Sequence, residues 1–213
     1  MVESATLERW CTSGYLGFES LPLRFIKVMN MENSIDISKY EHPSFFNNDQ
    51  DSVYCVIAAK TRREKLIAEN LKEIDVPYYL PTYEKVKRYK NGSQTHELPL
   101  FDGYIFHKKI PSKYTEIIQL SSKYTHAFEV DQSDTDLFLD QLRVIKKMLS
   151  AKATVQPYEH YKEGDKVRIK SGPLKDLEGF IVTEKKRFLF VVTVDILGQS
   201  VSCEIDPINF TRS

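Results

Sequence analysis

The segment from Glu84 to Glu97 carries the residues with the clearest chemistry. Its basic members are Lys85, Lys87, Arg88 and Lys90. Such side chains attract phosphate groups without regard to base sequence, so this cluster leaves a nucleic-acid partner open. Asn91-Gly92 favours a two-residue turn between antiparallel strands. The return arm, Ser93 to Glu97, is almost wholly polar. We therefore expect a basic ribbon that projects from its domain, because neither face has enough apolar residues for burial.

A second basic group, formed by Lys60, Arg62 and Arg63, precedes the ribbon in the chain. The formal net charge is zero, but residues 1–52 hold four basic and eight acidic residues, while residues 53–113 hold twelve basic and seven acidic. This local excess of +5 leaves a nucleic-acid partner open. The alternative is an ordinary solvated basic face.

The residues that could support catalysis or bind a metal are scattered. The histidines are His42, His96, His107, His126 and His160. They form no HExxH motif, and the chain has no P-loop or GxGxxG motif. The three cysteines show no CxxC spacing. We expect no enzyme, no cofactor and no metal site.

The amino-terminal residues, the apolar runs and the cysteines bear on the cellular location of the protein. It lacks the basic start of a signal peptide, and the apolar runs are shorter than the ~20 residues that span a bilayer. Together with an odd number of cysteines, this predicts a reduced, cytoplasmic protein without a membrane contact.

Residues 53–149 show strands and helices in alternation. Residues 53–59 form a short, β-branched apolar run that is typical of a buried strand, and a helical pattern begins at Arg62. A short strand is expected at 78–80 and another at the end of 98–106. A long helix follows Ser133, its expected N-cap. The order predicts an α+β domain, with an antiparallel sheet and flanking helices.

Residues 161–213 have a different pattern. Short alternating runs, such as Phe188 to Val194, are separated by turns at Ser171-Gly172-Pro173 and Leu197-Gly198-Gln199. Several short strands over about fifty residues predict a small all-β barrel. Residues 150–160 contain Pro157 and little periodicity, so we place a linker there.

Residues 1–52 show no sustained period and are expected to be a poorly ordered extension or an artefact of a misassigned start. Met29 and Met31 are alternative starting points for translation. Mass spectrometry of the native amino terminus distinguishes these readings.

Residues 164–179, which begin Gly164-Asp165-Lys166-Val167-Arg168, resemble the KOW motif of NusG-type transcription factors. Upstream, Tyr54 with Lys60, then residues 80–84 (LPTYE) and 99–106 (PLFDGYIF), resemble the amino-terminal NGN domain of that family in the same order. The resemblance covers roughly residues 53–210. It implies an NGN domain followed by an SH3-like KOW barrel.

The resemblance also implies a function. NusG-type factors bridge the cleft of RNA polymerase by gripping its clamp coiled coil, which lowers pausing and termination. The expected contacts to polymerase are aromatic and apolar side chains: Tyr54, Leu80, Tyr83, Phe101, Tyr104 and Phe106. Aromatic residues supply rigid anchors for a helical partner, although they can equally pack the domain's own core.

The basic residues Lys60, Arg62, Arg63, Lys85, Lys87, Arg88 and Lys90 are then expected to face upstream DNA or the non-template strand. In the barrel, the expected contacts to a ribosomal protein or termination factor are Leu174, Leu177, Phe180 and Ile196, with packing of the barrel core as the alternative. A monomer is expected.

Three positions depart from the family pattern. Val53 stands where the family usually has tryptophan, Asp102 replaces a proline, and Leu174 replaces a phenylalanine. These changes resemble specialised antiterminators of polysaccharide operons more than the general factor. The rival interpretation is a ribosome-associated KOW protein that binds RNA, but such a protein is expected to be far more basic.

Overall fold

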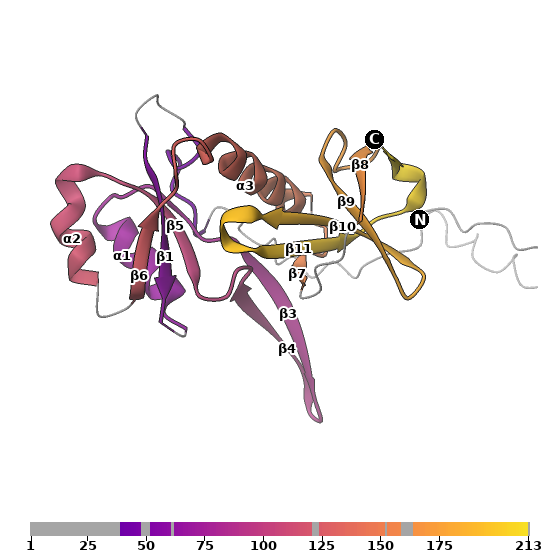
Figure 1. Ribbon diagram of the computed structural model, residues 1–213. Coiled ribbons are helices and arrows are strands. Elements are labelled where there is room, and N and C mark those ends of the chain that lie inside the picture. The colour runs from indigo at the N-terminus through magenta and orange to yellow at the C-terminus, as the bar shows by residue number, and fades with distance from the viewer. Residues whose placement is uncertain are drawn as a thin grey trace, which may run out of the picture. The chain divides into compact units, whose positions relative to one another are not determined.

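The computed structural model describes residues 39–47, 52–60, 62–120, 124–151, 153–158 and 164–212. Within these ranges the fold is α+β with antiparallel sheets, followed by an all-β unit, which confirms the predicted fold class (Figure 1). The expected start at Met29 or Met31 lies outside the described residues.

The amino-terminal domain is built on an antiparallel sheet. Its strands, in spatial order, are β2 (Tyr78–Tyr79), β5 (Tyr104–Lys108), β1 (Tyr54–Ala59) and β6 (Tyr124–Glu129). Strand β1 is buried along almost its whole length because helices cover both of its faces. This explains why its sequence is a continuous apolar run rather than an alternating one. Strand β6 has only a weak pattern, and the sequence did not predict it.

Helices form the outer layers of this domain. They are α1 (Glu64–Glu73), the 3-10 turn Pro111–Lys113 with α2 (Tyr114–Gln119), and α3 (Thr135–Ser150). Ile67 and Leu71 of α1 pack with Ile57 and Ile105 on one face of the sheet. Side chains of α3 pack on the other face with Tyr54 and Val56. The apolar stripe predicted for α3 is confirmed, since its four members are buried: Phe138, Leu142, Ile145 and Leu149.

The start of α3 differs by one residue from the prediction. Asp134, not Ser133, is the N-cap, and its side chain makes no capping hydrogen bond in the described part of the chain. Instead, the Thr135 hydroxyl donates to the Asp131 carbonyl (3.1 Å). The Asp134 amide donates to the same carbonyl (3.0 Å), so the helix begins on a turn in which the Asp131 carbonyl accepts both hydrogen bonds.

The segment Lys39–Asn47 belongs to the folded domain, although the sequence predicted that order begins at Val53. The Leu80 amide donates to the Tyr40 carbonyl and the His42 amide to the Tyr78 carbonyl (both 2.9 Å), so the segment lies along β2. Phe45 is completely buried between the Tyr54 and Tyr79 rings. The aromatic side chains, not the polar residues that follow, decide the position of this segment.

The predicted basic ribbon is present. Strands β3 (Thr82–Tyr89) and β4 (Gly92–Pro99) pair with each other and with no other strand in the described ranges. Figure 1 shows this hairpin projecting from the domain. The two-residue turn is Lys90-Asn91 rather than Asn91-Gly92, because Gly92 pairs with Tyr89. Gly92 has a φ of +140°, a conformation that favours glycine.

The carboxy-terminal domain is a curled antiparallel sheet, as predicted for a small barrel. Its strands, in spatial order, are β12 (Phe210–Arg212), β8 (Asp165–Ile169), β9 (Glu178–Glu184), β10 (Arg187–Val194), β11 (Gln199–Glu204) and β7 (Gln156–Tyr158). The 3-10 turns Asp195–Leu197 and Pro207–Asn209 connect the later strands. Strand β7 lies within the predicted linker 150–160 and pairs with β11, so the β domain begins before Tyr161.

The KOW-like stretch is explained by the packing of this domain. Val167 and Ile169 are completely buried, while Arg168 between them points outward to Glu178, with Nε 3.0 Å from a carboxylate oxygen. A Cβ added at Gly179 lies 2.6 Å from the Phe190 ring, closer than real Cβ contacts. The glycine is therefore required because another core side chain occupies the space beside it.

No helix in the described ranges is both long and apolar enough to cross a membrane.

Candidate partner and nucleic-acid interface

Most of the aromatic residues expected to contact polymerase are buried within the chain itself. Tyr54, Leu80, Phe101 and Phe106 are each no more than 2% exposed. The Phe106 ring packs edge-on against Phe101 and against Phe138 of α3, with centroids 5.9 and 5.4 Å away. These four side chains stabilise the domain in this conformation and are not part of an exposed docking patch.

Tyr83 and Tyr104 are the two members of that set that remain partly exposed. Both lie at the edge of the same apolar core. Partial burial raises the pKa of the Tyr83 hydroxyl, and the neighbouring Asp102 carboxylate raises it further. The Tyr83 hydroxyl therefore stays protonated and can act as a hydrogen-bond donor at any physiological pH.

The loop between the ribbon and β5 is held by a buried carboxylate. Glu64, in the first turn of α1, is 3% exposed, and its Oε1 accepts a hydrogen bond from the Gly103 amide (2.9 Å). The Gly103 carbonyl accepts a hydrogen bond from the Ala59 amide (2.7 Å). The backbone φ of Gly103 is +83°. The glycine of the LFDGY stretch thus makes the turn that presents Asp102 and Tyr104 at the surface.

All seven basic residues expected to face nucleic acid are exposed. Lys85, Lys87 and Arg88 lie on β3, and Lys90 lies in the turn at its tip. Lys60, Arg62 and Arg63 lie between β1 and α1. Because Lys65 of α1 contacts Glu97 of β4, the start of α1 and the base of the ribbon are neighbours. The fold therefore gathers two groups that are distant in sequence on one side of the domain.

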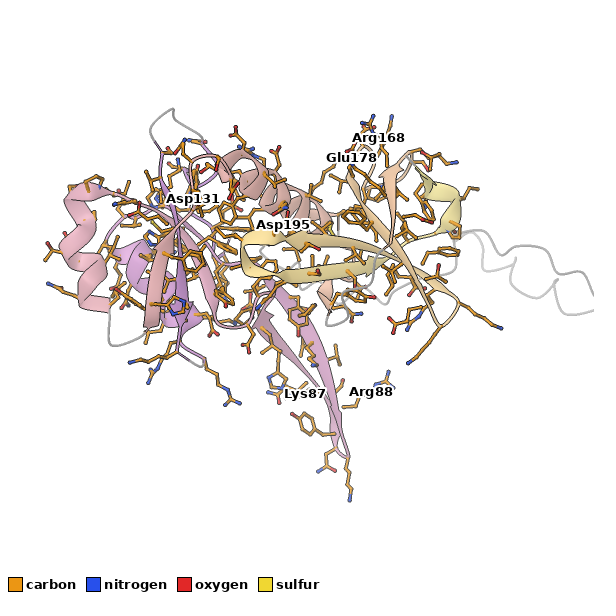
Figure 2. The ribbon with its side chains drawn as sticks, viewed as in Figure 1. Lys87, Arg88, Asp131, Arg168, Glu178 and Asp195 are labelled. Carbon is orange, nitrogen blue, oxygen red and sulfur yellow. The ribbon has the colours of Figure 1, made fainter. Side chains whose placement is uncertain are left out.

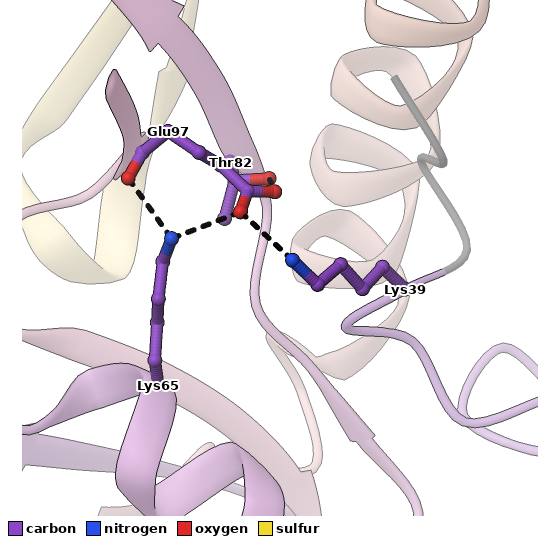
Figure 3. Close-up of polar contacts among 4 residues, drawn as sticks. All are labelled: Lys39, Lys65, Thr82 and Glu97. Atoms are coloured by element: carbon purple, nitrogen blue, oxygen red, sulfur yellow. Dashed lines mark hydrogen bonds and ion pairs between the residues drawn. The ribbon is translucent and has the colours of Figure 1, made fainter. Parts of the chain in front are cut away.

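A cluster of polar contacts fixes the base of the ribbon to the domain (Figure 3). The Glu97 carboxylate accepts hydrogen bonds from Lys65 Nζ (2.9 Å), Lys39 Nζ (3.2 Å) and Thr82 Oγ1 (3.1 Å). Lys65 Nζ also donates to the Glu97 carbonyl (2.9 Å). We call these four residues the ribbon anchor. It joins helix α1, both strands of the ribbon and the segment Lys39–Asn47.

The ribbon anchor keeps Glu97 ionised. Partial burial by itself raises the pKa of this carboxyl, but the hydrogen bonds from Lys65, Lys39 and Thr82 and the charge of Lys65 outweigh it, so the pKa is lowered overall. A carboxylate held by two ammonium groups and a hydroxyl forms stronger hydrogen bonds than neutral partners do. The anchor is therefore stable at neutral pH.

The expected partner contacts of the β domain also divide into buried and exposed members. Leu174 and Leu177 are buried in the domain core, so they are not available to a partner. Ile196 is partly buried and packs against the same core. Phe180 is 43% exposed, so its ring remains accessible to a partner.

Two cysteines in the described residues, Cys55 and Cys203, are buried on strands of different domains. Burial raises the pKa of each thiol to about 11, which leaves it protonated and unreactive at neutral pH. Among the described residues, no three potential metal-binding side chains cluster together.

Comparison with known proteins agrees with this geometry. The model of a family described as "Transcription termination factor nusG" matches residues 52–139, which include β1, the ribbon and the start of α3. The "Transcription termination/antitermination protein NusG" of Campylobacter jejuni is 29% identical over 159 residues, covering 70% of this chain and 86% of that protein. This chain is therefore similar to NusG-type transcription factors.

The chain also resembles a solved structure, described as "Domain interaction in Thermotoga maritima NusG". The identity is 15% and the TM-score 0.39, over 76% of this chain and 97% of that one. The family matches are to non-enzymatic factors, as the sequence predicted.

Sequence reasoning missed Glu64 and the ribbon anchor. Glu64 looks like an ordinary acidic residue in a first helical turn, and Glu97 looks like the end of a polar arm. A signal was present for the segment Lys39–Asn47, since two adjacent phenylalanines are unusual in a flexible extension.

Proposed function

We propose that this NusG-type factor binds transcribing RNA polymerase through its amino-terminal domain and suppresses pausing and termination. The observation that carries the proposal is the family match over residues 52–139 together with the exposed basic ribbon in the same segment. A bridging factor needs a docking surface and a charged surface, and no catalytic group.

Tyr83, Tyr104 and Asp102 form the proposed docking surface for the clamp coiled coil. Two half-buried tyrosines supply apolar area with polar tips, which is typical of contact residues in protein interfaces. Their backbones are held by the sheet and by the Glu64 contact to Gly103, so the surface is formed before binding. Phe180 is the proposed partner contact of the β domain, with a ribosomal protein or termination factor as the partner.

The basic residues around the ribbon contact upstream DNA or the non-template strand in this proposal. Phosphate attraction explains such binding without sequence preference. The factor then acts as a cytoplasmic monomer on polysaccharide operons, in keeping with the departures at Val53, Asp102 and Leu174.

A purified transcription assay past an intrinsic terminator tests the function. We expect the full chain to increase readthrough in a concentration-dependent way. Tyr104→Ala is expected to reduce this effect at subsaturating protein, whereas Ile208→Ala, an exposed apolar residue of the β domain, serves as the matched control. Unchanged readthrough at saturating wild-type protein contradicts the proposed function.

The rival function, RNA binding on the ribosome, is separated by co-purification. Recovery of RNA polymerase subunits with the tagged chain supports the elongation factor, and recovery of ribosomal particles without polymerase supports the rival.

A further inference from the structure

The ribbon joins the amino-terminal domain through two proline residues. Pro81 precedes β3, and Pro99, the last residue of β4, lies directly opposite Thr82. Proline has no backbone N–H to donate, so the hydrogen-bonded ladder cannot continue unbroken from the domain sheet into the ribbon. In the described ranges, β3 and β4 form a two-stranded sheet of their own. The direction of the ribbon therefore depends on contacts at its base.

The two faces of the ribbon can be assigned from its register. Side chains alternate between the faces of a strand, and Figure 2 shows Lys87 and Arg88 of β3 on opposite sides of the ribbon. By the same alternation, Tyr83 lies on the face that carries Lys87. Glu84 and its cross-strand partner Glu97 lie on the reverse face. The base of the ribbon thus presents a different side chain to the domain on each face.

Contacts hold the base of the ribbon on both faces. Tyr83 packs at the edge of the aromatic core. On the reverse face, Lys65 Nζ of α1 donates to a carboxylate oxygen and to the main-chain carbonyl of Glu97 (both 2.9 Å). Support on the reverse face can therefore be removed while Tyr83 stays in place.

The segment Lys39–Asn47 supports the reverse face from behind. The Tyr40 carbonyl accepts a hydrogen bond from the Leu80 amide (2.9 Å), one residue before Pro81. The Tyr40 ring is 8% exposed and packs in the same core cluster as Leu80. Tyr40 therefore fixes the chain where it enters the ribbon.

The Tyr40 ring also lies beside the two lysines of the ribbon anchor. Lys65 Nζ is 5.3 Å from the ring centroid, and Lys39 Nζ is 4.9 Å from it. The face of an aromatic ring attracts a cation, so the ring favours the position in which both ammonium groups reach Glu97. Lys39 is half-exposed, and an exposed ion pair contributes little by itself. The buried ring is therefore a larger support than the Lys39 charge.

We propose that the segment Lys39–Asn47 is a positioning element for the ribbon, and that Tyr40 is its positioning residue, which acts through Lys65 and Leu80. The segment lies outside the family match, which begins at residue 52. It holds the ribbon at a fixed angle to the domain before any partner binds, and a surface fixed in advance loses less conformational entropy on binding. The direction of the ribbon is a property of the free protein, so it does not depend on the proposed function.

Distances between spin labels on the ribbon tip and on helix α3 measure the direction of the ribbon. The labels are attached at Asn91→Cys and at the exposed position Leu137→Cys of the full chain, which also carries Cys11→Ser. Cys55 and Cys203 are buried and stay unlabelled. Double electron–electron resonance gives the distribution of distances. We expect a single narrow distribution when the segment is otherwise unchanged.

Tyr40→Ala is expected to make that distribution roughly twice as wide, because lost local contacts let a segment sample further orientations. Tyr40→Phe keeps the ring and the carbonyl and should restore the narrow distribution. Phe46→Ala is the matched control, since it removes a partly buried ring that packs against Tyr79 at the other end of the segment. An unchanged width for Tyr40→Ala overturns the proposal. Equal widening by Phe46→Ala also overturns it, because the cause is then general loosening of the segment.

A charge change gives a second test that does not require Tyr40→Ala to fold. Lys39→Glu places a carboxylate beside Glu97 on a half-exposed side chain and is expected to widen the distribution by a smaller amount. Lys72→Glu makes the same charge change at an exposed position of α1 and should leave the width unchanged. If Tyr40→Ala does not fold, equal widths for Lys39→Glu and Lys72→Glu overturn the proposal.

Terminator readthrough, measured with the same proteins, keeps this inference separate from the proposed function. Readthrough by wild type together with an unchanged width in Tyr40→Ala rejects the inference alone. Absent readthrough together with the expected pattern of widths rejects the proposed function alone.

Discussion

The aromatic core of the amino-terminal domain and the ribbon beside it differ in what surrounds their side chains. Phe106 packs against Phe101 and against Phe138 of α3, whereas Lys87 and Tyr89 are exposed on β3, which pairs only with β4 in the described ranges. An aromatic ring can lower its free energy either in a core or against a partner, but a lysine ammonium needs water or an opposite charge. Positive charge therefore indicated exposure for the seven basic candidates, whereas aromaticity did not indicate it for the expected polymerase contacts.

The largest expected effect is at Phe106. Phe106→Ala removes a completely buried ring and is expected to lower the free energy of unfolding by about 3–5 kcal/mol. Urea unfolding followed by circular dichroism measures it. Tyr83→Ala, at the half-buried edge, is the comparison and should cost no more than about 2 kcal/mol. A Phe106→Ala protein as stable as wild type contradicts the assignment of this ring to the core.

The β domain offers a second version of the same comparison. Leu177→Ala is expected to lower the free energy of unfolding by about 2–4 kcal/mol, because its side chain is buried. Phe180→Ala should change it by about 1 kcal/mol or less, since that ring is 43% exposed. Both values come from urea titrations of the full chain. Similar losses at the two positions indicate that Phe180 is a core residue and not a partner contact.

Loss of the ribbon anchor is expected to lower the free energy of unfolding by a smaller amount and to act locally. Glu97→Ala removes three side-chain hydrogen bonds and is expected to cost about 1–2 kcal/mol. Hydrogen exchange should become faster at the base of the ribbon. Glu84→Ala is the matched control, an exposed carboxylate directly opposite on the same face. Equal exchange rates in the two variants show that the anchor does not position the ribbon.

The smallest expected effect is the change with pH in the stability that the ribbon anchor contributes. The pKa of Glu97 is lowered in the folded protein, so the unfolded chain takes up a proton first as the pH falls. The stability that Glu97 contributes is therefore complete above the ordinary carboxyl range and is lost as the pH falls below it. The difference in unfolding free energy between wild type and Glu97→Ala should shrink over that acidic range. A difference that persists unchanged below it contradicts a role for the carboxylate charge.

Local patterns predicted much of the fold. Strand β1, helix α3, the hairpin and the alternating strand β10 all follow from periodicity or turn chemistry. Strands β6 and β9 were missed because their sequences alternate weakly, and their positions depend on pairing with neighbours. The segment Lys39–Asn47 was missed for a similar reason, since Phe45 gains its place only from rings that lie elsewhere in the sequence.

The candidate site residues show the same division between what the sequence predicted and what required the structure. All seven basic residues were identified from the sequence and are exposed, but the separation of Lys85 and Lys87 from Arg88 on two faces of the ribbon required the register of β3 and β4. Of the six aromatic and apolar candidates, burial removes Tyr54, Leu80, Phe101 and Phe106 from the exposed surface.

The sequence alone indicated the resemblance to NusG-type factors, the α+β domain with its basic hairpin, and the β domain that follows. These rest on local composition, periodicity and motif spacing, which do not depend on distant contacts. Only the tertiary structure decided which aromatics are buried, that Lys39 and Lys65 meet Glu97 at the ribbon base, and which lysines share a face with Tyr89. Each of these depends on residues far apart in the chain being brought together, and burial and charge pairing are properties of that assembly.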